Sequence, residues 1–259
     1  HMRTDDSVLR IARNQLYPIR RARGYAPDPI RLPAPVKSVL ATGAELKNVF
    51  CLTRDHYAFL SHHIGDMENY ETLQSFESGV EHFQRLFRIQ PEILACDLHP
   101  DYLATHYAVT RAASEDLPLY QVQHHHAHLA ACLADNGWDK TQSVIGVCFD
   151  GTGYGSDGAI WGSEFLIGGY QGYSRFAHLK YTPLPGGDAA VRRCSRMALA
   201  HLWAAGLDWE SSFAPAASLS LEERSVLHIQ LEKGVNAPLT SSMGRLFDAA
   251  ACLAGGRDR

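Results

Sequence analysis

The chain has 259 residues, 46% of them hydrophobic and 20% charged, and its 28 acidic and 24 basic side chains give a formal net charge of −4. This is the composition of a globular protein with one large domain or two modest ones. It argues against binding along a nucleic-acid backbone, which usually needs a basic excess. No apolar run approaches the roughly 20 residues of a membrane helix, and no signal-peptide core is present, so we expect a cytoplasmic protein without a membrane partner.

Residues 1–36 precede the first regular pattern of strands and helices. His1 stands before Met2, so we interpret these two residues as a remnant of an expression tag. A candidate short strand, DDSVLRIA, is followed by an arginine- and proline-rich tract, and the frequent prolines favour an extended path. We expect a solvated connector up to residue 36, with an anion-steering surface as the alternative.

A first lobe is predicted over residues 37–142. Two apolar runs around GAELKN predict a β-hairpin. An amphipathic helix follows, because its apolar residues are spaced three or four apart; they are Leu73, Phe76, Val80, Phe83 and Leu86. PEILACD then predicts a buried strand, YLATHYAVTRAASE a helix, PLYQVQ a strand, and HHHAHLAACLAD a helix that ends at Asn136-Gly137.

A second lobe is predicted over residues 143–259. It begins with a glycine-rich hairpin, SVIGVCFDGTGYGSDGAIWGSEFLIGGY, and continues with helices at about 189–206, 219–233 and 241–254. No strand pattern is evident after residue 181. Strands that alternate with helices indicate an α/β fold, here with two lobes that each open with a hairpin. Because the second lobe lacks late strands, we expect it to be incomplete.

The most specific chemical signal is the run Gln123-His124-His125-His126-Ala127-His128. If a helix begins near His124, then His124 and His128 lie one turn apart on one face, with Cβ atoms about 6 Å apart. Two imidazoles at this spacing suit one metal ion, as in the H-E-x-x-H helix. A polar helix start without metal is the alternative. The set also requires an oxygen ligand, for which Asp150 after the strand VIGVCF is our candidate, with simple turn formation as its alternative.

Other polar residues at strand ends and glycine turns are weaker candidates. Asp97 and His99 follow a buried strand, where ligand contacts are common, and we assign them a catalytic role, with turn stabilisation as the alternative. A glycine turn can present backbone N–H groups to an anion. We expect nucleotide or phosphate contacts from five residues: Lys47, Gly151, Gly153, Asp188 and Asp248. For Lys47, a solvated surface lysine is the alternative. Neither turn matches a P-loop or a dinucleotide-binding fingerprint.

Six blocks in order make the chain recognisable: VLATGAELKNVFCL, HIGDMENYET, DLHPDY, VQHHHAHLAACLADNG, FDGTGYGSDGAIWGSEFL and SSMGRLFDA. From about residue 15 onward, the chain closely resembles the carboxyl-terminal, TsaD-like domain of the hydrogenase maturation carbamoyltransferases (HypF). The resemblance implies the two-lobed α/β fold shared by actin, sugar kinases and heat-shock ATPases. It also implies that residues 3–10 are the trailing edge of a YrdC-like domain.

The resemblance implies a function and its cofactors. The family makes carbamoyl-adenylate from carbamoyl phosphate and ATP, and passes the carbamoyl group to the terminal cysteine of the partner HypE, on the way to the cyanide ligands of nickel-iron hydrogenase. In the family, positions matching His124, His128 and Asp150 hold a divalent metal, iron or zinc. The chain's own cysteines are not expected to act as nucleophiles, because the family delivers to a thiol of its partner.

Departures from the family pattern limit these expectations. The family continues past residue 259 and supplies a further aspartate to the metal, and it usually has Arg-Glu-Pro-Trp-Arg where this chain has RRCSR at 192–196. We therefore expect that this chain alone does not turn over ATP with carbamoyl phosphate. The alternatives are a non-catalytic module that docks HypE or nucleotide, and a relative of the tRNA threonylcarbamoyl transferases.

Overall fold

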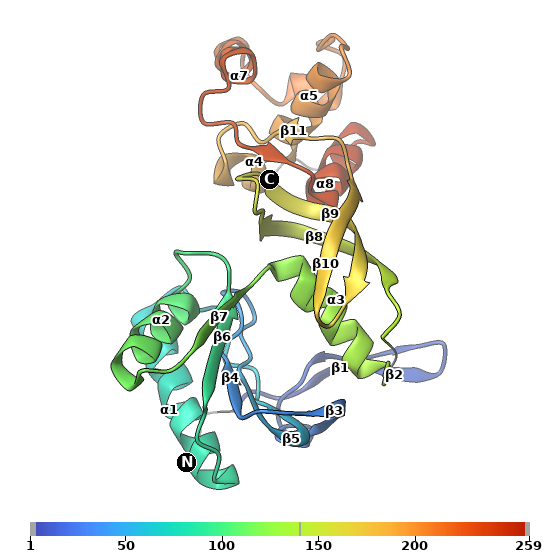
Figure 1. Cartoon of the computed structure of the whole chain (residues 1–259). Coiled ribbons are helices and arrows are strands. Elements are labelled where there is room, and N and C mark those ends of the chain that lie inside the picture. Colours follow the sequence, from blue (N-terminus) through green and yellow to red (C-terminus); the bar gives the residue numbers. More distant parts are fainter. Residues whose placement is uncertain (1–3, 140, 257–259) are drawn as a thin grey trace. The chain divides into compact units, whose positions relative to one another are not determined.

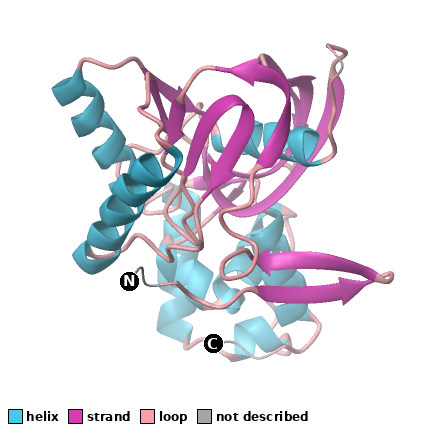
Figure 2. Ribbon diagram, turned by 90° about the horizontal axis from the view of Figure 1, so that it is seen from below, coloured by secondary structure: helices cyan, strands magenta, loops and turns pink. Residues whose placement is uncertain are grey.

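The computed structural model describes residues 4–139 and 141–256, and the chain folds into two compact units, residues 1–141 and 142–259 (Figure 1). His1 and Met2, interpreted above as a tag remnant, lie outside the described residues. Both units combine strands with helices (Figure 2). In the described part of the chain, no helix is both long enough and apolar enough to cross a membrane.

The first unit is built on a five-stranded mixed sheet with the order β3-β5-β4-β6-β7. Strands β4 (Val39–Ala41), β6 (Ile93–Asp97) and β7 (Leu119–Val122) are parallel, whereas β5 (Cys51–Leu60) runs antiparallel to β4 and to β3 (Ile30–Val36). The predicted hairpin around GAELKN is confirmed as β4 and β5. A core of apolar side chains from β4, β5, β6 and the helices α1 (Tyr70–Phe87) and α2 (Leu103–Glu115) packs against this sheet.

Residues 8–36 are more ordered than a connector. Strands β1 (Val8–Ala12) and β2 (Gln15–Arg20) form a separate antiparallel hairpin, so the short strand predicted in DDSVLRIA is confirmed over its last five residues. Ile30–Val36 is strand β3 of the main sheet, and the expectation of a solvated connector up to residue 36 is wrong there. Two prolines, Pro33 and Pro35, are tolerated because β3 is an edge strand whose pairing with β5 is interrupted between Arg31 and Val36.

Helix α1 begins at Asn69, whose side chain accepts a hydrogen bond from the Thr72 N–H. Phe76, Val80 and Phe83 are buried as predicted. Leu86 is 53% exposed, however, and Phe87 packs against the core instead. Three turns of about 3.6 residues separate Phe87 from Phe76, so Phe87 lies on the buried face and Leu86 lies beside it.

The second unit contains another five-stranded sheet. Strands β8 (Val144–Tyr154) and β10 (Gly172–His178) pair antiparallel with β9 (Ile160–Gly169), so the predicted hairpin is confirmed. β12 (Leu239–Thr240) pairs parallel with β9 and antiparallel with β11 (Thr182–Pro183). The expectation of no strand after residue 181 is therefore wrong, because strands of two residues leave no periodic pattern.

Within residues 142–256, the sheet is accompanied by the helices α4 (Asp188–Arg192), α5 (Cys194–Ala204), α6 (Ala214–Ala217), α7 (Leu221–Lys233) and α8 (Met243–Leu253). The predicted helix at 189–206 is divided at Arg193, whose backbone is extended with φ −124° and ψ 99°. α8 begins at Ser242, whose hydroxyl accepts the Arg245 N–H. Two apolar clusters centred on α5 bury Met197 and Leu199 completely.

A buried ion pair links strands and a loop of the second unit. Glu164 on β9 is fully buried, and Arg175 Nε on β10 donates to its Oε2 at 2.6 Å. Arg175 also donates to the Asp157 carboxylate at 2.9 Å, and its guanidinium stacks over the Trp161 ring. The Ser241 hydroxyl donates to the other oxygen of Glu164 at 2.5 Å. β10 is therefore tied to the β8–β9 turn through Asp157 and to β9 through Glu164, and β9 is tied to the segment before α8 through Ser241.

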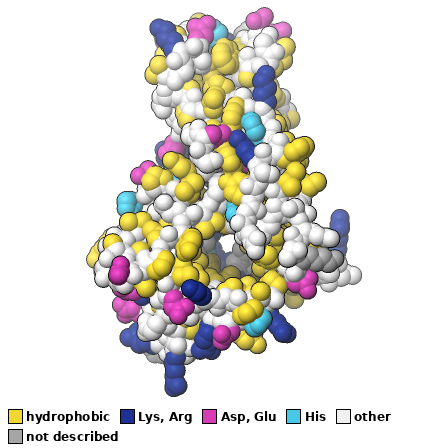
Figure 3. All heavy atoms as spheres, in the orientation of Figure 1, with side chains coloured by type: hydrophobic (Ala, Val, Ile, Leu, Met, Phe, Trp, Pro, Cys, Tyr) yellow, Lys and Arg dark blue, Asp and Glu magenta, His cyan; other side chains and the backbone are white. Residues whose placement is uncertain are grey.

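Charged side chains of both signs are interspersed on the face that Figure 3 presents, where Lys and Arg lie among Asp and Glu. All six cysteines are thiols rather than disulfides. Cys96, Cys148 and Cys252 are buried, Cys51 and Cys194 are partly buried, and Cys132 is exposed.

Candidate functional site

Four of the residues singled out from the sequence line one cavity of the first unit. Lys47, Asp97, His124 and His128 surround a cavity of about 500 Å³, together with backbone and small side chains of the 41–49 segment and of β6. A cavity of this size is typical of a small-molecule site. The first unit therefore brings its chemically distinctive residues together without help from the rest of the chain.

The sheet topology explains why these residues meet. β6 and β7 are parallel neighbours whose last residues, Asp97 and Val122, are paired. Asp97 thus ends β6 beside the point where the chain leaves β7 for α3 (His124–Asp135). Figure 1 shows β6 and β7 as neighbours and α3 following β7. The Gln123 side chain caps α3 by accepting the His126 N–H. Ligands commonly bind at the carboxyl ends of such strands.

The two histidines have the geometry that their spacing predicts. α3 begins at His124, and the rings of His124 and His128 have centroids 4.7 Å apart with planes at 87°. His124 is half-buried and His128 is exposed, whereas His125 is fully buried. Adjacent imidazoles at the mouth of a cavity are a suitable donor set for a transition metal such as iron or zinc.

Asp97 and His99, the expected catalytic residues, differ in position. Asp97 is buried, lines the cavity, and its Oδ2 lies 2.6 Å from His124 Nδ1. His99 is absent from the lining of this cavity within the described residues; its ring stacks on Tyr102 with centroids 4.0 Å apart, and its Nδ1 accepts the Asp101 N–H. The geometry therefore connects Asp97 directly with the histidine pair.

The segment 43–48 forms another wall of the cavity. Gly43 has φ +74°, and a Cβ there would lie 2.6 Å from the Val49 carbonyl oxygen, so the tight turn requires glycine. Lys47 is exposed, and its backbone N–H donates to Asp66 Oδ1 at 2.7 Å. Sequence reasoning did not single out buried Asn48, whose amide donates to the Thr42 and Ala44 carbonyls and fixes this loop.

Asp150 belongs to the second unit and lies in a different local structure from the one predicted. The turn between β8 and β9 comes later in the chain than Asp150, at residues 155–159. The β8–β9 register shifts between Phe149 and Gly153, so Asp150 and Gly151 lie in a bulge within β8. The Asp150 Oδ1 accepts the Gly151 N–H, and the Ser242 hydroxyl donates to the Gly151 carbonyl at 2.6 Å. Bulges commonly re-aim side chains beside functional sites.

The remaining expected nucleotide contacts lie on separate elements of the second unit. Gly151 and buried Gly153 are at the bulge, and exposed Asp188 begins the short helix α4. Asp248 on α8 pairs with Arg245 and lines a cavity of about 580 Å³ with Val191, Cys194 and Cys252, among others. Asp188 is not among the described residues around that cavity.

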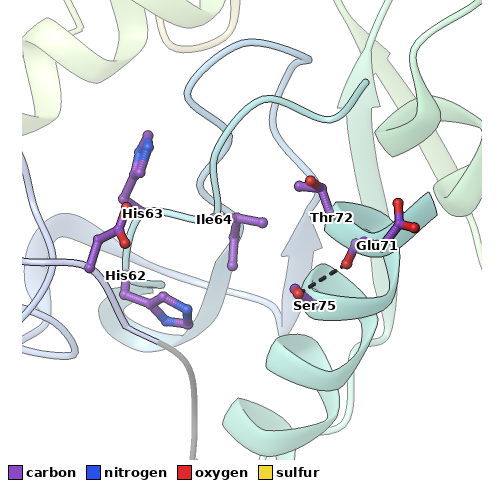
Figure 4. A pocket seen from close by; sticks show the side chains of 7 residues that line it. His62, His63, Ile64, Glu71, Thr72 and Ser75 are labelled. Atoms are coloured by element: carbon purple, nitrogen blue, oxygen red, sulfur yellow. Dashed lines mark hydrogen bonds between the residues drawn. The ribbon is translucent and has the colours of Figure 1, made fainter. Parts of the chain in front are cut away.

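A second, smaller cavity of the first unit lies beside the start of α1. His62, His63, Thr72 and Ser75 line it with Glu71, whose backbone carbonyl accepts the Ser75 hydroxyl (Figure 4). Burial lowers the pKa of both histidines below the usual value, and neighbouring positive charge lowers each pKa further. The predicted site residues do not line this cavity.

Two family models match the chain, and together they cover most of it. One is described as the HypF Kae1-like domain and matches residues 34–135; the other, described as the second subdomain of the carbamoyltransferase Kae1-like domain, matches residues 146–259.

Similar proteins of known name are HypF carbamoyltransferases. Carbamoyltransferase HypF2 of Cupriavidus necator is 44% identical over 99% of this chain and 32% of its own length, and HypF of Rhodobacter capsulatus is 43% identical over 97% of this chain and 34% of its own length. The chain thus spans about a third of these relatives.

Among solved structures, full-length HypF in a phosphate- and nucleotide-bound form matches with a TM-score of 0.89 and 43% identity, covering 99% of this chain and 33% of that one. HypF of T. kodakarensis matches with a TM-score of 0.84 and 34% identity, over 99% and 35% of the two chains. The expected α/β fold of the actin, sugar-kinase and heat-shock ATPase class is confirmed.

Proposed function

Because the chain belongs to the family of HypF Kae1-like domains, we propose that in the cytoplasm it serves to pass a carbamoyl group from carbamoyl-adenylate to the terminal cysteine of HypE. This step belongs to the synthesis of the cyanide ligands of nickel-iron hydrogenase. The family resemblance implies that the adenylate is made from carbamoyl phosphate and ATP in a separate, YrdC-like domain. The nucleotide reported for a solved HypF supports nucleotide binding here.

The observation that carries the proposal is the pair of imidazoles at the cavity of the first unit. His124 and His128 offer two nitrogen donors one helical turn apart, and we propose that they bind a divalent iron or zinc ion. Asp150 is the proposed third ligand, a role supported by the family resemblance and by its place in a bulge. When bound, the cation supplies positive charge that polarises an acyl phosphate and stabilises the departing nucleotide phosphate.

We propose supporting roles for the other candidates. Lys47 contacts phosphate from the cavity wall, and Gly151 and Gly153 present backbone to the nucleotide, with Asp188 and Asp248 as further contacts. Cys96, which also lines the cavity, is not the acceptor, because burial and the neighbouring Asp97 raise the pKa of its thiol to about 11 and keep it protonated. This supports delivery to a thiol of the partner.

To test this function, the other components of the reaction are added to the purified chain. The chain is mixed with ATP, carbamoyl phosphate, HypE and a full-length HypF relative whose own histidine pair has been replaced by alanine. We expect mass spectrometry to show carbamoylated HypE with the wild-type chain and none with the His124→Ala, His128→Ala double variant. Equal carbamoylation with both chains would contradict the proposal.

Two simpler measurements separate this function from the alternatives. The chain by itself is expected to show no ATP turnover dependent on carbamoyl phosphate, and sustained turnover would contradict this. A docking module is favoured instead if the purified chain holds no metal yet still captures HypE.

A further inference from the structure

The buried carboxylate of Asp97 contacts His124, the first of the two histidines that we propose as metal ligands. The Asp97 side chain is 6% exposed, and its Oδ2 lies 2.6 Å from Nδ1 of His124, whose side chain is 20% exposed. This contact joins the end of β6 to the start of α3, two segments 27 residues apart. Such a short contact between a carboxylate and an imidazole is a charge-assisted hydrogen bond.

Asp97 is itself firmly held. Its backbone pairs with Val122 of β7, and its carbonyl accepts the Thr105 hydroxyl at 3.3 Å. Its Oδ1 accepts the His99 N–H at 2.9 Å, which is an Asx turn that fixes the side-chain torsion. The two carboxylate oxygens thus make different contacts: Oδ1 accepts the hydrogen bond that holds the loop after β6, and Oδ2 contacts His124.

We infer that Asp97 is a positioning residue that selects the tautomer of His124 for metal binding; this inference rests on the metal site proposed above. A carboxylate accepts hydrogen bonds and has no proton to give, so His124 Nδ1 carries the hydrogen. The lone pair then lies on Nε2, the nitrogen on the opposite side of the ring from Asp97. Metal-binding histidines commonly donate their other N–H to a carboxylate in this way, which fixes the ring and raises its basicity.

This role replaces the catalytic role that the sequence suggested for Asp97. Both of its oxygens are engaged by hydrogen bonds from the protein, so the side chain is arranged to hold its neighbours. It acts on substrate through His124. His128, one turn further along α3, does not share this contact with Asp97 among the described ion pairs.

The most informative variant is Asp97→Asn, because the two oxygens have separate tasks. Asparagine has the same size and keeps an Asx-turn acceptor for the His99 N–H. Its amide nitrogen then replaces Oδ2 and donates to Nδ1 of His124, which forces the hydrogen onto Nε2. The variant is expected to fold normally and to present the wrong tautomer. Asp101→Asn, in the same loop, is the matched control.

The tautomer is measured without metal, from two-bond proton–nitrogen NMR spectra of chain labelled with ¹⁵N-histidine, in mildly alkaline buffer. Subtraction of the His124→Ala spectrum identifies the His124 signals. We expect the Nδ1–H form in wild type and in Asp101→Asn, and the Nε2–H form in Asp97→Asn. The same tautomer in wild type and Asp97→Asn would overturn the inference.

The affinity of each variant for Zn²⁺ is measured separately, by competition with a coloured chelator. We expect Asp97→Asn to weaken Zn²⁺ binding about 10–100-fold, as removal of such partners typically does, and Asp101→Asn to leave it unchanged. If His124→Ala loses Zn²⁺ binding while Asp97→Asn keeps the wild-type affinity for Zn²⁺, the inference about Asp97 is overturned. The proposal that His124 and His128 bind the metal then stands. If His124→Ala keeps the wild-type affinity for Zn²⁺, the proposal that His124 and His128 bind the metal is refuted. The NMR measurement of the tautomer then decides separately whether Asp97 orients His124.

Discussion

Replacing Arg175 by methionine tests the buried ion pair that organises the second unit. Methionine keeps much of the apolar stem of Arg175 but removes the guanidinium, which lies over the Trp161 ring and pairs with the fully buried Glu164. Removal of one partner from a buried pair costs about 3–5 kcal/mol, because the remaining charge has lost its compensation. We expect Arg175→Met to lower the free energy of unfolding of the second unit by this amount at neutral pH.

The destabilisation caused by Arg175→Met should change with pH in a definite direction. Burial raises the pKa of Glu164, but hydrogen bonds from Arg175, Ser241 and the Gly162 N–H outweigh it and lower that pKa below the usual value. In wild type this stabilisation is present above the unfolded-state pKa and is lost as the pH falls through the lower folded-state pKa. In Arg175→Met burial is no longer opposed by the cation, so Glu164 binds a proton more readily. The destabilisation should therefore shrink as the pH falls from about 7 to about 5.

The assay is urea unfolding followed by tryptophan fluorescence, since three of the four tryptophans, Trp161, Trp203 and Trp209, lie in the second unit. Arg193→Met is the control, because its partner Glu223 is an exposed carboxylate and its loss should matter far less. Glu164→Gln combined with Arg175→Met should recover part of the stability. A loss below about 1 kcal/mol at neutral pH, or one that does not shrink in acid, would refute the reasoning.

Two further predictions concern the first unit. Phe76→Ala should lower the free energy of unfolding by about 3–5 kcal/mol, because its ring is buried against Phe50 and Tyr107. Leu86→Ala, at an exposed position, should change it little when urea unfolding is followed by far-UV circular dichroism, which reports on the helices of the first unit. Equal effects would show that the buried face of α1 is assigned wrongly. Iodoacetamide at mildly alkaline pH should alkylate exposed Cys132 and spare Cys96, because the Cys96 thiol is buried and has a pKa of about 11. Peptide mass spectrometry measures the modification of each cysteine. Rapid modification of Cys96 would contradict the prediction.

The sequence was sufficient for features set by local periodicity. The spacing of His124 and His128, after an apolar strand and before an Asn-Gly stop, predicts one helix with both rings on one face, and the structure has that helix. The spacing of Phe76, Val80 and Phe83 similarly predicts the buried face of α1. These patterns are properties of a single helix and need no knowledge of its neighbours.

Features set by pairing between distant segments could not be predicted. The contact of Asp97 with His124 depends on β6 and β7 being parallel neighbours in register, which no local pattern reveals. The bulge at Asp150 resembles a turn in sequence, because glycine serves both. β3 was missed because its prolines argue against a strand, although an edge strand tolerates them.

Crystals of the chain soaked in Zn²⁺, with diffraction recorded on both sides of the zinc absorption edge, test the central claim most directly. We predict an anomalous peak within bonding distance, about 2.0–2.1 Å, of one ring nitrogen of His124 and one of His128. An anomalous map with zinc bound elsewhere, or with no peak beside these two rings, would contradict the account.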